Sequence, residues 1–228
     1  MVLGGLAKLT LLDFPGKVAC TVFTLGCNFR CPFCHNASLV EGTPLDSLTV
    51  EEFFRFLEKR RGLLDGVAVT GGEPYMQPDI LDFLREIKGR GYAAKTDTNG
   101  SYPERLRAAV KEGLVDYVAM DIKNSKEKYA ATIGLTATPS AVFESVDFLL
   151  SGAVPYEFRT TVVNELHEPG DFAAIGEWIK GAPRYYLQAF TDSGDILFGG
   201  MTAATPEKMR ACLAAVKPFI ANAELRGL

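Results

Sequence analysis

The stretch VACTVFTLGCNFRCPFCHN, residues 18–36, joins an apolar run to a loop that holds three of the five cysteines in the chain. The apolar run, 18–25, lacks clean alternation with polar residues, which is typical of a strand buried on both faces. Cys27, Cys31 and Cys34 follow within eight residues. A cluster of three cysteines fits neither of the common structural uses of cysteine, because disulfides use cysteines in pairs and a closed zinc site needs four ligands. The rest of the chain must therefore explain them.

Further apolar runs of similar length recur along the chain, at 66–70, 92–98, 116–122, 156–163 and 184–190. Between them lie helical patterns with clear start and stop residues. The starts are Thr49 with Glu52, Pro103, Thr138 with Pro139, and Thr205 with Pro206; the stops are Gly62, Gly113 and Gly152. Six strands that alternate with helices predict a parallel sheet.

The length of the chain limits how complete this sheet can be. A full eight-stranded barrel takes roughly 250 residues, and this chain has 228. We therefore expect one α/β domain over 1–228, built as a partial (β/α)6 TIM-like barrel that is open on one side. In such folds ligands bind at the carboxyl ends of the strands, which is where the cysteine loop begins.

Composition excludes several classes of partner. The net charge of −4 gives no electrostatic footprint for nucleic acid. No apolar run approaches the roughly 18 residues of a membrane span, and no signal-peptide pattern is visible. We expect a cytoplasmic protein without a nucleic-acid or membrane partner, where reduced thiols favour metal or catalytic cysteines over disulfides.

The cysteine loop allows three interpretations. Unrelated core cysteines are disfavoured because the loop also holds polar residues and Pro32. A zinc site lacks a convincing fourth ligand, since His35 adjoins Cys34 in sequence, while Cys20 and Cys212 are expected to be core thiols. Three thiolates on a tight loop can hold three irons of a 4Fe–4S cluster and leave the fourth iron open for a ligand.

The loop resembles the signature of the radical S-adenosylmethionine (SAM) superfamily, in which this spacing carries an aromatic residue before the third cysteine, here Phe33. The resemblance implies that Cys27, Cys31 and Cys34 bind one 4Fe–4S cluster, with Phe33 beside the cofactors. It implies that SAM chelates the open iron through its amino and carboxylate groups. The reduced cluster then passes one electron to the sulfonium, and a 5′-deoxyadenosyl radical forms.

The segment TGGEP, residues 70–74, follows the second apolar run. Gly71 and Gly72 allow a backbone to approach a ligand closely, and Glu73 adds a carboxylate at a strand end. In the family that the chain resembles, this motif binds the SAM amino group, which implies a cofactor-binding role for these residues and Pro74. The alternative is an ordinary strand-to-helix turn with an exposed acid.

Two further segments, KTDTNG at 95–100 and MDIK at 120–123, resemble the SAM site of glycyl-radical-enzyme activases. The resemblance implies SAM-binding roles for Asp97, Thr98, Asp121 and Lys123. The two aspartates should converge at the barrel mouth, where they need a positive charge between them, from Lys123 or from a bound monovalent cation. The alternative is a solvated rim.

Single residues in the later strands complete the candidate site. Arg159 is placed to bind the SAM carboxylate as a planar fork; the alternative is a strand-edge arginine that is exposed or paired with Glu157. The roles of Gln188 and Phe190, as lining or packing residues, stay open. His167 lies in a polar loop and is expected at the surface.

The segments DFPGK, CHN, KTDTNG, VAMDIK and EFRTT together resemble anaerobic ribonucleoside-triphosphate reductase activating proteins. This implies an oxidoreductase that takes a hydrogen atom from a backbone glycine of a glycyl radical enzyme, with flavodoxin or ferredoxin as electron donor. Two alternatives stay open: a radical SAM enzyme that modifies a small molecule or a peptide, which a closed pocket would favour, and a non-catalytic iron–sulfur or zinc protein.

Overall fold

In the part of the chain that the structure describes, eight strands form a single sheet whose spatial order follows the sequence. The computed structural model describes residues 1–42, 47–136 and 139–227. The strands are β1 (Leu3–Thr10), β2 (Ala19–Thr24), β3 (Gly66–Gly71), β4 (Ala93–Thr98), β5 (Tyr117–Asp121), β6 (Tyr156–Val162), β7 (Tyr185–Ala189) and β8 (Ala223–Arg226). Strand β1 runs antiparallel to β2, and every later neighbouring pair is parallel. No pairing joins β8 to β1 among the described residues, so the sheet is open.

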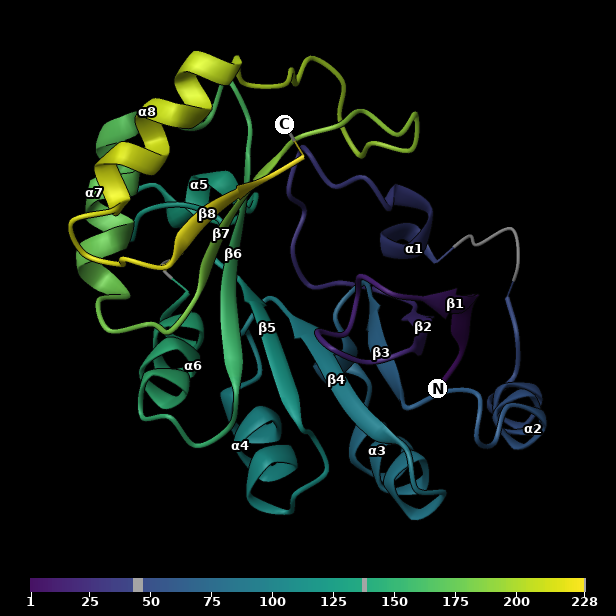
Figure 1. The fold of residues 1–228 in the computed structure, drawn as a ribbon. Helices are drawn as coiled ribbons and strands as arrows, with labels where there is room; N and C mark the ends of the chain where they lie inside the picture. Colours follow the sequence, from purple (N-terminus) through teal and green to yellow (C-terminus); the bar gives the residue numbers. More distant parts are fainter. Residues whose placement is uncertain (43–46, 137–138, 228) are drawn as a thin grey trace.

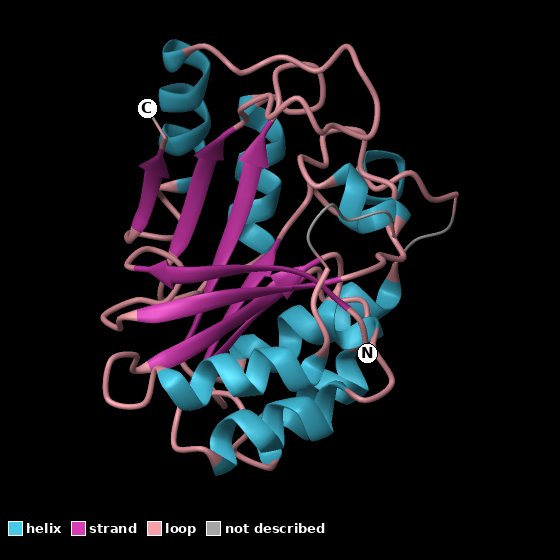
Figure 2. Ribbon diagram, turned by 90° about the vertical axis from the view of Figure 1, so that its right-hand side faces the viewer, coloured by secondary structure: helices cyan, strands magenta, loops and turns pink. Residues whose placement is uncertain are grey.

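The predicted α/β fold with an open parallel sheet is confirmed. The six predicted strands correspond to β2–β7, each within a residue or two of its predicted bounds. The two outermost strands, β1 and β8, were not predicted, so the count of six is too low. Figure 2 shows the strong twist of the sheet from one edge to the other, as expected for parallel strands.

The helices are α1 (Ala37–Glu41), α2 (Val50–Lys59), α3 (Ile80–Gly89), α4 (Pro103–Lys111), α5 (Tyr129–Thr132), α6 (Ser140–Leu150), α7 (Pro169–Trp178) and α8 (Pro206–Val216), with a 3-10 turn η1 (Pro74–Met76). In Figure 1 the longer helices lie around the outside of the sheet. Helix α2 begins with the predicted capping box between Thr49 and Glu52, and Thr205 caps α8. Thr138 lies outside the described residues.

The core lies between the sheet and these outer helices. Strand β2 is buried from Ala19 to Val22, as its lack of alternation predicted. Helices α2 and α3 press Phe53, Phe54 and Phe83 together, with ring centroids 5.3 to 5.4 Å apart. Burial of each such side chain contributes roughly 1.5–3 kcal/mol. This packing joins the helices that precede β3 and β4, and the two strands pair in parallel from Gly66 with Ala93 to Val69 with Thr96.

No helix in the described part of the chain is long and apolar enough to cross a membrane.

Candidate functional site

A cavity of about 220 Å³ opens at the carboxyl ends of the strands. Most of the residues predicted from the sequence line it: Cys27, Cys31, Phe33, Cys34, Gly71, Gly72, Asp97, Thr98, Asp121, Lys123 and Arg159. Glu73 and Pro74 do not. The structure therefore brings together residues that are spread over more than 130 positions of the sequence, because parallel strands present their carboxyl ends at one edge.

The cysteine loop connects β2 to α1 and is held by backbone hydrogen bonds. Gly26 N–H donates to the Leu39 carbonyl at 2.8 Å, and Arg30 N–H donates to the Ile133 carbonyl at 3.0 Å. Within the loop, Cys34 N–H donates to the Cys31 carbonyl at 3.0 Å. These bonds turn the three thiol side chains of the loop toward one cavity.

The thiol set fits a cluster better than a single metal ion. In the described residues, no three histidine, cysteine or acidic side chains lie close enough to share one ion. A 4Fe–4S cube does not need this, because each thiolate binds a different iron. Cys20 and Cys212 are fully buried elsewhere, as predicted for core thiols. The residues present therefore fit a cluster held by Cys27, Cys31 and Cys34.

Gly71 and Gly72 are required by the backbone around them. Gly71 has a φ of +115°, a region that side chains disfavour. A Cβ on Gly71 would lie 2.3 Å from the Thr24 nitrogen, and one on Gly72 would lie 2.0 Å from the Gly26 oxygen. Gly71 thus lets the end of β3 lie directly against the end of β2, and Gly72, the next residue, lies against Gly26 at the start of the cysteine loop. Both glycines also line the cavity.

Glu73 is fully buried, and its carboxylate points into the protein. It accepts hydrogen bonds from Tyr75 N–H at 3.0 Å, the Thr98 hydroxyl at 2.8 Å and Asn99 N–H at 2.6 Å. Burial raises the pKa of Glu73 to about 7, although these three hydrogen bonds act in the opposite direction. The acid therefore ties the end of β3 to the end of β4.

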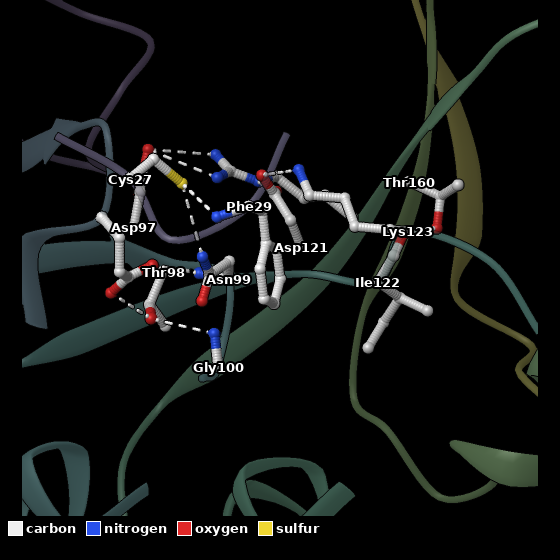
Figure 3. A network of polar contacts seen from close by, with 12 residues as sticks. Cys27, Phe29, Asp97, Thr98, Asn99, Gly100, Asp121, Ile122, Lys123 and Thr160 are labelled. Atoms are coloured by element: carbon white, nitrogen blue, oxygen red, sulfur yellow. Dashed lines mark hydrogen bonds and ion pairs between the residues drawn. The ribbon is translucent and has the colours of Figure 1, made fainter. Parts of the chain in front are cut away.

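A charged network lies across the cavity, with Arg159 at its centre. The Arg159 Nε donates to Asp121 at 3.0 Å, and its terminal nitrogens lie 3.3 Å from Asp97. Lys123 pairs with Asp121 at 2.9 Å, and Lys95 pairs with Asp97. Figure 3 shows Asp97, Asp121 and Lys123 converging from neighbouring strands. The predicted convergence of the two aspartates is therefore confirmed.

The network keeps both aspartates ionised. Burial alone would raise the pKa of Asp121, but Lys123 and Arg159 outweigh it and hold the pKa below its usual range. The pKa of Asp97 is lowered in the same way, by Arg159 and Lys95 against burial. Three cations face two carboxylates, so the network has one excess positive charge. A buried excess charge is costly unless a ligand balances it.

Asn99 was not singled out from the sequence, although it belongs to the KTDTNG segment. Its Nδ2 lies 3.7 Å from the Cys27 sulfur and 3.1 Å from the Asn28 side-chain oxygen. The Phe29 N–H also points to this sulfur, at 3.4 Å. Hydrogen bonds to cysteine sulfur raise the reduction potential of a bound cluster, so these groups suit a redox site.

His167 lies in the interior, and the expectation of a surface histidine was wrong. Its Nδ1 accepts from Val163 N–H at 3.0 Å, so the proton is on Nε2, which donates to the Lys123 carbonyl at 2.8 Å. Burial lowers its pKa. The loop misled the prediction because its charged neighbours Glu165 and Glu168 occupy the exposed side.

Besides Arg159, two lining residues come from the strands beyond β5. Thr161 follows Arg159 by two positions on β6 and so shares its face, and Gln188 is its register partner on β7. Phe190 is buried and does not line the cavity. Strand alternation could have identified Thr161. For Gln188 the sequence left lining and packing open, and the structure shows that it lines the cavity.

Comparisons with known proteins agree with this site. The family model of the radical SAM superfamily matches residues 21–168. The chain is 29% identical over 232 residues to a putative glycyl-radical enzyme activating enzyme of Methanocaldococcus jannaschii, covering 99% of this chain and 95% of that protein. It is 33% identical over 136 residues to the pyruvate formate-lyase-activating enzyme of Clostridium pasteurianum, covering 54% of each chain.

Among solved structures, Streptococcus suis SuiB bound to its precursor peptide SuiA has a similar fold, with a TM-score of 0.70. It is 11% identical, and the match covers 90% of this chain and 47% of SuiB. The cysteine loop, the glycines that support it and the match to the family model together show that the chain belongs to the radical SAM superfamily.

Proposed function

We propose that this radical SAM enzyme generates a glycyl radical on a partner protein, and that the partner is anaerobic ribonucleotide reductase. The observation that carries the activase part is the match, along nearly its whole length, to a relative named as a glycyl-radical enzyme activating enzyme. The choice of ribonucleotide reductase rests on the sequence segments that resemble its activating proteins. An open sheet supports the proposal because a loop of a folded partner must reach the cofactors.

When bound, the cluster and SAM supply an electron and a carbon radical that can take a hydrogen atom from a C–H bond. The protein holds the cluster through Cys27, Cys31 and Cys34 and shields it with Phe33, whose ring is buried in the cavity wall. The excess positive charge of the network supports a carboxylate-binding role for Arg159 and Lys123. SAM carries such a carboxylate.

The SAM amino group needs hydrogen-bond acceptors. We assign this role to the backbone carbonyls of Gly71 and Gly72, because both residues line the cavity. The N–H groups of Gly72 and Glu73 donate to the Thr24 and Gly26 carbonyls and so hold this part of the backbone in place. Glu73 and Pro74 would act from behind the wall by fixing these carbonyls. The Thr98 hydroxyl donates to the Glu73 carboxylate at 2.8 Å. Thr98 also lines the cavity in which we propose that SAM binds.

A monovalent cation was the remaining cofactor prediction. Its ligands would be Asp97 and Asp121, whose oxygens already contact Arg159. We propose that an ion binds here only by displacing the guanidinium. The test is the affinity for SAM, measured in potassium, sodium and a large organic cation at constant ionic strength. If the affinity differs between the cations, a small cation displaces the Arg159 guanidinium from the two aspartates. If the affinity is the same in all three, no cation binds there and Arg159 keeps its contacts.

The electron donor and the compartment are proposed from the sequence alone. Reduced flavodoxin or ferredoxin is the proposed donor, in the cytoplasm. The second candidate function is modification of a peptide, and it is favoured by the fold similarity to SuiB bound to its precursor peptide. Formation of a cross-linked or otherwise modified peptide without a stable protein radical would favour it.

The proposal is tested by electron paramagnetic resonance (EPR). Reconstituted protein, SAM and a reductant are incubated anaerobically with the anaerobic ribonucleotide reductase of the same organism. We expect a stable glycyl radical signal in the reductase, and no signal with the Cys31→Ala variant. Cleavage of SAM without this signal, although the cluster is complete, would contradict the activase proposal but not the family assignment.

A further inference from the structure

The segment after β7, residues 191–198, is bound along the cysteine loop; we call it the strap. Leu197 N–H donates to the Cys34 carbonyl at 3.1 Å, and Phe198 N–H donates to the Pro32 carbonyl at 3.2 Å. The Ser193 hydroxyl donates to the His35 carbonyl at 3.0 Å. The strap therefore holds the backbone on both sides of the third cluster cysteine.

Asp195 connects the strap to the start of α1 through its side chain and its backbone. Its carboxylate accepts from Ser38 N–H at 3.2 Å and from the Ser38 hydroxyl at 2.8 Å, and its backbone carbonyl accepts from Ala37 N–H at 3.1 Å. Hydrogen bonds to an ionised group are roughly twice as strong as neutral ones. The carboxylate thus fixes the start of α1, where the cysteine loop ends.

The position of the strap explains why such an anchor is useful. The sheet is open between β8 and β1 in the described part of the chain, so strand pairing cannot hold these two edges together. Figure 1 shows the segment after β7 reaching across to α1, which follows β2. The strap joins the two sides of the opening at the carboxyl ends of the strands, where the cavity lies.

We propose that the strap clamps the cysteine loop and that Asp195 is a positioning residue for the cluster ligands. It touches neither the cavity nor a thiol, and it acts by limiting the motion of the loop that carries Cys31 and Cys34. The clamp does not depend on the substrate, so it can fail or succeed independently of the activase proposal.

The test measures how firmly the loop and the cluster are held. Reconstituted protein is mixed anaerobically with an iron chelator, and iron release is followed by absorbance. We expect Asp195→Ala to release iron at least about tenfold faster than wild type, because it loses hydrogen bonds to a charged group. Hydrogen exchange of the apoprotein should show faster exchange at the amides of Ser38, Leu197 and Phe198.

Asp192→Asn is the matched control. It removes the same charge three positions away, and its side-chain oxygen can still accept from Gly194 N–H, as the Asp192 carboxylate does in the wild type. We expect wild-type iron release and exchange from this variant. Ser38→Ala removes the hydroxyl that donates to Asp195, and it should increase the rate of iron release less than Asp195→Ala does. The double variant should release iron no faster than Asp195→Ala alone.

Iron release and amide exchange from Asp195→Ala and Ser38→Ala that match those of Asp192→Asn would overturn the proposal. Additive effects in the double variant would also overturn it, because groups in direct contact must couple. If Asp195→Ala does not fold, Ser38→Ala and the exchange of the wild-type amides still decide the question. In that case we expect the backbone amides of Leu197 and Phe198 in the wild type to be protected from hydrogen exchange. Fast exchange at these amides would contradict the clamp.

Discussion

Arg159 shows what one side chain can do when it lies between two acids. It contacts Asp97 and Asp121 from two neighbouring strands, and so the carboxylates can approach without repelling each other. The predicted alternative, a pair with Glu157, is wrong: Glu157 accepts from the Tyr117 hydroxyl and pairs with Arg226. Pairs across strands depend on the register, which the sequence does not reveal.

Loss of Asp121 should leave Arg159 and Lys123 with too little negative charge. We expect Asp121→Ala to lower the free energy of unfolding of the apoprotein by roughly 2–3 kcal/mol, less than a fully buried pair would lose, because Asp121 is partly exposed. Urea unfolding measures this. Asp82→Ala, on the exposed face of α3, is the control and should change stability by less than about 0.5 kcal/mol. Equal effects would show that the network is a solvated rim.

Glu73 gives a pH dependence whose sign follows from its pKa. The pKa is about 7 in the folded protein and 4.5 when exposed, so the folded state binds more protons between these values. The free energy of unfolding of the wild type, compared with that of Glu73→Gln at the same pH, should therefore fall by about 3 kcal/mol as the pH rises from 4.5 to 7. Urea unfolding of both apoproteins at several pH values tests this. A difference that stays constant or grows with pH would show that the three hydrogen bonds outweigh burial.

The turn from β3 into η1 illustrates how far the sequence could be interpreted. Two adjacent glycines predicted that the backbone lies close to a ligand. The glycines do line the cavity, and the structure also shows Gly72 close to Gly26 of the cysteine loop. A motif shows that space is restricted without showing what fills it. Glu73 was likewise recognised as important, while its burial depended on tertiary packing.

Gly72→Ala should disturb the cysteine loop from the neighbouring strand. Its Cβ would lie 2.0 Å from the Gly26 oxygen, so we expect a loss of roughly 1–3 kcal/mol or more and a lower iron content after reconstitution. Gly89→Ala, at the end of α3 where a Cβ meets nothing within 4 Å, should be neutral or stabilising by up to about 1 kcal/mol. Normal iron content in Gly72→Ala would contradict the proposed support.

Elements with a strong pattern were predicted and weakly patterned ones were not. Strands β2–β7 are apolar runs between helix signals, and capping residues identified the starts of α2 and α8. Strand β8 has four residues, AELR, of which half are charged, and β1 contains two glycines and pairs antiparallel. The strap, TDSGDILF, has the composition of an ordinary loop, and its role comes from distant backbone partners.

The continuous sheet supports the prediction of one domain over 1–228. We expect the apoprotein to unfold in a single transition, with the same midpoint by circular dichroism and by fluorescence of Trp178. This is the one tryptophan in the chain, and it packs edge-on against Tyr129 and Phe143. Two separate transitions would show that the halves of the sheet unfold independently.

The molecule as a whole combines a cluster loop, a charged network and an open sheet. The proposed reaction transfers a hydrogen atom from a glycine of the partner to the 5′-deoxyadenosyl radical, which gives 5′-deoxyadenosine and leaves a glycyl radical on the partner. Deuterium transfer measures that step most directly. The anaerobic ribonucleotide reductase is produced with glycine deuterated at its α-carbon and incubated with the protein, SAM and a reductant. Mass spectrometry should find one deuterium in 5′-deoxyadenosine, formed in step with the glycyl radical. If 5′-deoxyadenosine forms from a fully loaded enzyme but stays free of deuterium, the reductase glycine is not its substrate.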